Sequence, residues 1–131
     1  MAESESKFSL EDFELYHRAR AFCKDIYRVI HRLPPEEKYC LGSQMRRAAV
    51  SITNNIAEGH GRWYYQENIR FCRTARGSVE EVIDDLNVCI DEAYEDPARV
   101  ETLKSAAHEL VYRINGYISY LRKSKQGDQD K

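Results

Sequence analysis

Four stretches of this chain repeat apolar side chains every three or four residues, and this spacing constrains the fold more than any other feature. The longest unbroken series is Val100, Leu103, Ala107, Leu110, Ile114, Tyr117 and Leu121. This spacing matches the turn of an α-helix and gathers the apolar side chains on one face. No stretch alternates apolar and polar residues as a strand would. The pattern predicts an all-α protein.

The same spacing occurs in three earlier segments. The expected helices span residues 11–33, 41–58 and 65–95, and a fourth begins at Pro97. Because the connections between them are short, consecutive helices are expected to run antiparallel. The sequence therefore predicts an up-down-up-down four-helix bundle over residues 10–123. A disordered leader, 1–9, is expected before it and a polar tail, 124–131, after it.

Local signals suggest where the helices begin and end. Ser43 is expected to cap the start of the second helix, and Asp96, which precedes a proline, the start of the fourth. Gly59 and Gly61 are expected to end the second helix, because glycine adopts left-handed dihedrals without penalty. Gly77 lies inside the third expected helix, where glycine costs ~1 kcal/mol relative to alanine. Its presence there predicts close helix packing.

The sequence argues against several classes of function. No apolar run approaches the ~18–20 residues of a membrane span, and the polar N-terminal stretch does not resemble a targeting peptide. A cytoplasmic protein is expected. Glycine-rich phosphate loops, metalloprotease helices and nucleophile elbows are missing. The histidines have no i, i+4 partner and are expected to be solvated; they are His17, His31, His60 and His108. We therefore expect no enzymatic activity, no cofactor and no metal.

The cysteines follow the helical pattern rather than a metal-binding one. Cys23, Cys72 and Cys89 fall on apolar stripes, whereas Cys40 lies in the first connection. No two are close enough in sequence to form a typical zinc-ligand pair. The first three are expected to be reduced, buried thiols that act as small hydrophobic side chains.

Charge is distributed unevenly, although the net charge is only −2. Between residues 43 and 76 the basic residues outnumber the acidic ones; they are Arg46, Arg47, Arg62, Arg70, Arg73 and Arg76. Between residues 78 and 101 acidic residues predominate, and an acidic patch is expected at Glu80, Glu81, Asp84 and Asp85. The basic segment could hold a polyanion, or it could meet the acidic segment of a second subunit. Two solvated faces without a partner are the third possibility.

Aromatic residues accompany the arginines in the second connection, where Trp63 and Tyr64 follow Arg62. Rings beside guanidinium groups are typical of surfaces that bind looped or single-stranded RNA, since bases stack on the rings. The same residue types dominate protein interfaces. The segment is therefore a candidate for RNA binding, for subunit contact, or for both. An alternative function is that of a protein–protein adaptor.

Several ordered motifs carry a family resemblance that covers residues 8–123. The central motifs are Gln44-Met45-Arg46-Arg47-Ala48-Ala49-Val50-Ser51-Ile52, Asn55-Ile56-Ala57-Glu58-Gly59 and Phe71-Cys72-Arg73-Thr74-Ala75-Arg76-Gly77-Ser78. With these motifs the chain resembles the 23S rRNA intervening-sequence protein family, a set of small bacterial four-helix-bundle proteins. It is also similar to the accessory variability proteins of diversity-generating retroelements.

The resemblance implies more than the residue pattern alone. It implies a left-handed bundle that assembles as a homopentamer, an RNA-associated role and no enzymatic activity. The likeness to the retroelement proteins implies a possible partner, a reverse transcriptase.

Overall fold

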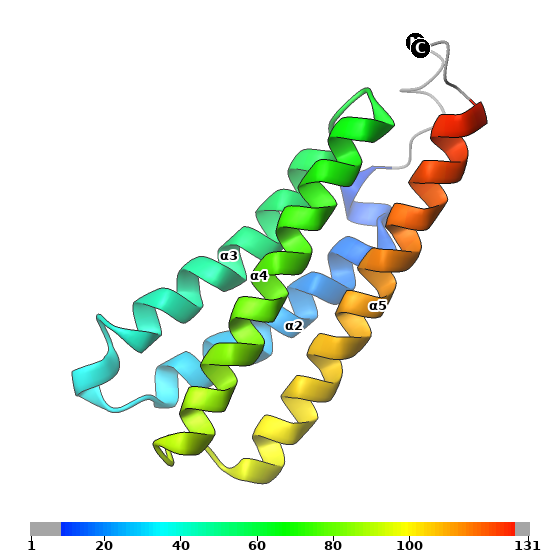
Figure 1. Cartoon of the computed structure of the whole chain (residues 1–131). Helices are drawn as coiled ribbons and strands as arrows, with labels where there is room; N and C mark the ends of the chain where they lie inside the picture. The colour runs from blue at the N-terminus through cyan, green and yellow to red at the C-terminus, as the bar shows by residue number, and fades with distance from the viewer. Residues whose placement is uncertain (1–8, 128–131) are drawn as a thin grey trace.

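Four antiparallel helices form the fold in the computed structural model, which describes residues 9–127 (Figure 1). The helices are α2 (Glu14–Arg32), α3 (Leu41–His60), α4 (Tyr65–Asp91) and α5 (Pro97–Gly127). Short 3-10 turns, η1 (Leu10–Asp12) and η2 (Pro35–Glu37), precede α2 and α3. No strand occurs among the described residues, and the predicted all-α, up-down-up-down four-helix bundle is confirmed.

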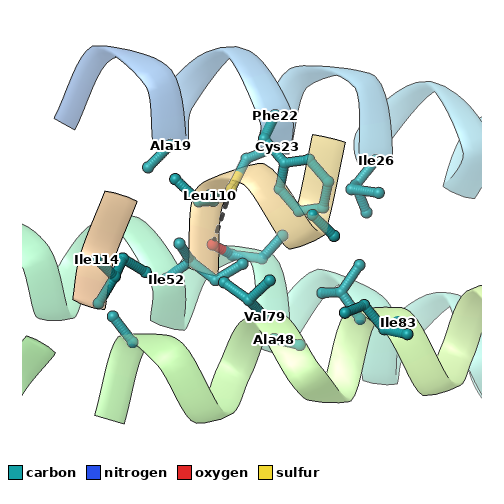
Figure 2. Packing of buried hydrophobic residues seen from close by; sticks show 14 of the residues in the cluster. Ala19, Phe22, Cys23, Ile26, Ala48, Ile52, Val79, Ile83, Leu110 and Ile114 are labelled. Carbon is teal, nitrogen blue, oxygen red and sulfur yellow. Dashed lines mark hydrogen bonds between the residues drawn. The ribbon is translucent and has the colours of Figure 1, made fainter. Parts of the chain in front are cut away.

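The core runs the length of the bundle and uses the predicted stripes. Figure 2 shows Ala19, Cys23 and Ile26 of α2 facing side chains from the other three helices, such as Ile52, Val79 and Ile114. The Cys23 thiol donates a hydrogen bond to the backbone carbonyl of Ala49 (3.3 Å), which joins α2 to α3. On α5 the stripe continues through the buried Ile118, while Tyr117 is half-buried. Burial of these stripes is the main stabilising contribution.

The start of α3 differs from the prediction. The helix begins at Leu41, so Ser43 lies inside it and does not cap it. The Glu37 carboxylate instead accepts a hydrogen bond from the backbone N–H of Leu41 (3.3 Å). The preceding turn η2 brings Glu37 back over the helix start. At α5 the expectation is confirmed, because the Asp96 carboxylate accepts a hydrogen bond from the backbone N–H of Ala98 (3.3 Å).

The end of α4 also differs, since the helix stops at Asp91 rather than Glu95. Ala93 adopts a left-handed φ of 58° and is exposed instead of joining the apolar stripe. The backbone N–H of Tyr94 then bonds back to the carbonyl of Cys89 (2.8 Å), as in a Schellman motif. The Tyr94 hydroxyl also donates a hydrogen bond to Glu37 (2.7 Å), which ties this turn to the α2–α3 connection.

The glycines follow the prediction only in part: Gly61 ends α3 as its C-cap, but with a φ of −80° rather than a left-handed one. Gly59 is buried inside α3, and none of the described glycines has a positive φ. A Cβ at Gly59 would lie 2.6 Å from Oδ1 of Asn68 and 3.0 Å from Cβ of Phe71. Gly59 therefore allows α3 and α4 to approach closely. At Gly77, where close packing was predicted, a Cβ would meet nothing within 4 Å, so that prediction is wrong within the single chain.

The expected terminal segments fall mostly outside the described part of the chain. Residues 1–8 of the expected leader and 128–131 of the expected tail are not described. Helix α5 continues to Gly127, past the boundary at 123 expected from the sequence.

Candidate nucleic-acid interface

The register of α3 against α4 decides which of the candidate residues lie together. The Ser78 hydroxyl donates a hydrogen bond to the Ser51 hydroxyl (2.7 Å), which fixes the middle of the two antiparallel helices. The α3–α4 connection, with the first turns of α4, forms one end of the bundle (Figure 1). The start of α3 and the second half of α4 lie toward the other end. The basic segment is therefore split between two ends.

Arg62, Trp63 and Tyr64 form the α3–α4 connection itself. Arg62 pairs with Glu58 (Nη2 to Oε2, 2.6 Å), and its guanidinium lies 5.0 Å from the ring centroid of Phe71. Trp63 and Tyr64 are 38% and 52% exposed. The connection thus presents two aromatic rings to solvent beside an arginine that is already held in place.

A buried polar contact fixes the base of this connection. The Asn68 side chain, only 3% exposed, donates a hydrogen bond from Nδ2 to the Tyr117 hydroxyl (3.1 Å). Burial raises the pKa of Tyr117 to about 12, although this hydrogen bond from Asn68 acts in the opposite direction. Gly59 packs against Asn68 from α3. Three helices therefore meet at Asn68, and they orient the loop that follows Gly59.

Arg70 and Arg73 lie on the outer side of α4, within three turns of the connection. Both are exposed, and neither takes part in an ion pair within the described part of the chain. Arg76 differs, because it is half-buried and donates a hydrogen bond to the Asn115 side chain of α5 (2.6 Å). Of the three arginines on α4, only the first two are free to bind an anion.

Arg46 and Arg47 lie away from this end. The Arg46 guanidinium is 5.5 Å from the ring centroid of Tyr27 on α2. Arg47 lines a surface pocket of about 400 Å³ together with Asp84 and Asp85, and it donates a hydrogen bond to Ser43 (3.1 Å). The structure does not bring these two arginines together with Arg70 and Arg73.

The acidic patch is smaller than the sequence indicated. Glu80, Glu81 and Asp84 are exposed on α4, but Asp85 is only 3% exposed. Its Oδ2 atom is buried and has no hydrogen-bond partner in the described structure. Burial, together with the negative charges of Asp84 and Glu81, raises the pKa of Asp85 to about 6.

The arrangement offers binding groups rather than an assembled catalytic centre. No cluster of three or more His, Cys, Asp or Glu side chains suited to a metal ion occurs among residues 9–124. His60, expected to be solvated, lies instead in the last turn of α3, is 9% exposed and stacks on Phe13. Cys40 is exposed and Cys23, Cys72 and Cys89 are buried, as the pattern predicted. No helix in the described part of the chain is both long and apolar enough to cross a membrane.

Comparison with known proteins identifies the class. A family model described as the 23S rRNA-intervening sequence protein matches residues 11–116, and the chain belongs to this family. A similar solved structure is a protein of unknown function from the S23 ribosomal protein family of Bacteroides thetaiotaomicron VPI-5482. It shares 20% sequence identity and a TM-score of 0.74, covering 79% of this chain and 97% of its own. That likeness supports the fold. No curated protein matches the chain significantly.

Two residues that support the site were missed from the sequence. Asn68 looked like one polar position among many on α4, and His60 like part of a loop. The available signal was the apolar spacing itself, because Asn68 precedes Ile69 and lies four residues before Cys72, on the buried side of the helix. The hydrogen bond from Asn68 to Tyr117 forms only when α5 packs against α4, so the sequence of neither helix alone predicts it.

Proposed function

We propose that this member of the 23S rRNA-intervening sequence family is a non-enzymatic RNA-binding protein that uses the α3–α4 end of its bundle. The observation that carries the proposal is the pair of exposed arginines without ion-pair partners, Arg70 and Arg73, in the first turns of the helix that follows the exposed rings of Trp63 and Tyr64. Guanidinium groups bind phosphate in a planar, bidentate manner, and aromatic rings stack on unpaired bases. RNA loops offer both chemical groups together.

The family supports the same conclusion, because its description refers to intervening sequences of 23S rRNA. RNA encoded in or around such sequences is the class of ligand that we propose.

We further propose that the chain self-associates. The family resemblance implies a homopentamer, and α4 carries opposite charges on its two halves. Light scattering at micromolar concentration is expected to give a mass near that of five chains or a multiple of five, and a monomer would contradict self-association.

A second candidate function is that of a protein adaptor, such as an accessory subunit of a reverse transcriptase. It is favoured by the same exposed rings, since Trp, Tyr and Arg also dominate the energetics of protein interfaces. On this alternative, the connection binds a protein surface and RNA affinity is weak.

Replacing Arg70 and Arg73 by glutamine tests the RNA site. The change keeps helix propensity and removes two charges, so affinity for a structured RNA hairpin is expected to fall while the bundle stays folded. A matched control replaces Arg46 and Arg47 by glutamine, which removes the same charge from the other half of the molecule. The control is expected to retain most of the affinity, because those arginines lie away from the proposed site.

Trp63→Ala tests base stacking at the connection. Loss of a stacked base is expected to cost ~1–3 kcal/mol of RNA binding. Each variant is sized before its affinity is measured, because a change of assembly would alter RNA binding indirectly. Intact assemblies with unchanged RNA affinity would remove this end of the bundle as the RNA site and favour the adaptor function.

A further inference from the structure

The outward face of α4 carries arginines on one side of Gly77 and carboxylates on the other. The exposed residues along this face are Arg70, Arg73, Thr74, Gly77, Glu80, Glu81 and Asp84. Successive residues of an α-helix are rotated by about 100° around its axis, so all of these residues point within about 60° of the direction of Gly77. The arginines precede Gly77 by seven and four residues, and the carboxylates follow it by three, four and seven. The basic and the acidic residues therefore lie at nearly equal distances from Gly77, on opposite sides of it along the helix.

The charges on this face are unused within the single chain. None of the two arginines and three carboxylates takes part in an ion pair among the described residues. They are also too far apart along one helix to pair with one another, because Arg73 and Glu80 are seven residues, or about 10 Å, apart along the axis. The described part of the chain therefore supplies no ion-pair partner for either sign.

Gly77 is the second unexplained feature of this face. Glycine in a helix interior is unfavourable relative to alanine, yet a Cβ here would contact nothing within 4 Å. Gly59, by contrast, is required by its contact with Asn68 and Phe71. The advantage of glycine at position 77 therefore does not arise from packing inside the bundle. A second helix that crosses at this point would use it, because glycine allows two helix backbones to approach closely.

We propose that a second copy of this chain docks antiparallel on the outward face of α4, with the two helices crossing at Gly77. A two-fold axis at this point brings Arg73 beside the partner's Glu80. It also brings Arg70 beside the partner's Glu81 and the partner's Asp84. Each contact occurs twice, as an isologous interface requires.

The charge order on α4 favours the antiparallel arrangement over a parallel one. If two α4 faces packed parallel on each other, residues at the same level would meet, so arginines would face arginines and carboxylates would face carboxylates. The proposed contact joins chains in pairs, so it lies between two rings rather than inside one, and a ring of five that also uses it gives an assembly of ten chains. It rests on the self-association proposed above, and it shares Arg70 and Arg73 with the proposed RNA site, so RNA and the second copy would compete.

A single cysteine placed at the proposed axis tests the contact in the absence of RNA. Gly77→Cys is introduced in a Cys40→Ser background, because Cys40 is the exposed native thiol. Mild oxidation is expected to convert this variant to a disulfide-linked dimer, since a residue at the axis lies beside its own copy. The matched control is Gly116→Cys on α5, another exposed helical glycine whose Cβ would meet nothing within 4 Å. It is expected to stay largely uncrosslinked.

The results separate this inference from the proposed self-association. If the wild-type protein is monomeric and Gly77→Cys does not crosslink, both are wrong. If the wild type is oligomeric but Gly77→Cys crosslinks no faster than Gly116→Cys, self-association stands and the α4 contact is wrong.

Charge reversal gives a second test that does not depend on a disulfide. One variant carries Arg70→Glu with Arg73→Glu, and the other carries Glu80→Arg with Glu81→Arg. Each variant by itself is expected not to form the contact, because like charges then face each other across the two-fold axis. A 1:1 mixture is expected to form, in sedimentation at low salt, a larger assembly that contains both variants. Mixed variants that remain as separate as each variant alone would overturn the proposal.

Discussion

Asp85 is the residue at which burial and charge conflict most directly. Its side chain lies under the α2–α3 connection with one buried oxygen that accepts no hydrogen bond. An ionised carboxylate in that position is costly, so the folded state favours the protonated acid and raises the pKa of Asp85 from 3.8 to about 6. The stability that follows from this shift is present at low pH and is lost as the pH rises from about 4 to 6.

Asp85→Asn is expected to stabilise the protein at pH 7.5. Asparagine has nearly the same shape and carries no charge, so it avoids a penalty of about 1–3 kcal/mol, at ~1.4 kcal/mol per pKa unit. At pH 4, where the native side chain is already protonated, the variant and the wild type are expected to unfold at similar urea concentrations. Urea unfolding at both pH values measures the difference.

The exposed neighbour gives the control for this prediction. Asp84→Asn removes the same charge from solvent-exposed surface and is expected to change stability by less than Asp85→Asn. A loss of stability on Asp85→Asn at pH 7.5 would show that the ionised carboxylate makes a favourable interaction in the folded state.

The cysteines make a second prediction at the level of single residues. Burial raises the pKa of Cys23 and Cys72 to about 12 and that of Cys89 to about 11. Because the thiolate is the reactive form, these three are expected to react with an aromatic disulfide reagent only after unfolding. Cys40 is exposed and is expected to react at once. Rapid reaction of all four cysteines in the native protein, seen as release of four equivalents of the aromatic thiol, would contradict the helix register.

At the scale of the helices, substitution by alanine is expected to stabilise the protein at Gly77 and Gly116 and to destabilise it at Gly59. Gly77→Ala and Gly116→Ala add helix propensity without a clash, so each is expected to raise the free energy of unfolding of the isolated chain by ~1 kcal/mol. Gly59→Ala is expected to lower it by about 1–3 kcal/mol, because its Cβ would overlap Asn68. Thermal unfolding of the three variants measures these effects, and a stabilised Gly59→Ala would show that α3 and α4 can separate at no cost.

The helices were predictable from the sequence because each apolar stripe is a local pattern. The same pattern correctly assigned Cys23, Cys72 and Cys89 to the core. The errors lie where a contact from elsewhere in the chain decides the outcome. Glu37 caps α3 in place of Ser43, and it does so because the turn η2 folds it back. A left-handed Ala93 ends α4, although its spacing fits the apolar stripe.

The candidate site was less predictable, because it depends on how the helices are aligned. Arg47 and Arg73 appeared in one basic segment of the sequence, but the antiparallel register places Arg47 beside Asp84 instead. Arg76 points to α5 and bonds Asn115, a partner 39 residues away. Local spacing identified the residue types suited to binding, and only the packed bundle shows which of them are exposed together.

At the scale of the whole molecule, the two ends of the bundle differ in chemistry. The α3–α4 end presents exposed arginines and aromatic rings, whereas the other half of α4 carries exposed carboxylates and the buried Asp85, with Arg47 beside them. A polyanion is expected to prefer the first end, because the carboxylates on the other half offset the charge of Arg47. The orientation of bound RNA is therefore expected to be set by this polarity, with contacts made at one end.

The salt dependence of RNA affinity tests the central claim most directly. Affinity of the wild type for a structured RNA hairpin is measured by fluorescence anisotropy from about 50 to 200 mM salt, alongside the Arg70→Gln, Arg73→Gln double variant and the matched Arg46→Gln, Arg47→Gln control. Each lost phosphate contact reduces the slope of log affinity against log salt by about 0.7–0.9. We predict that the Arg70, Arg73 variant loses about two such contacts and the control fewer. Equal slopes in all three proteins, or no RNA binding by the wild type at low salt, would contradict an RNA site at the α3–α4 end.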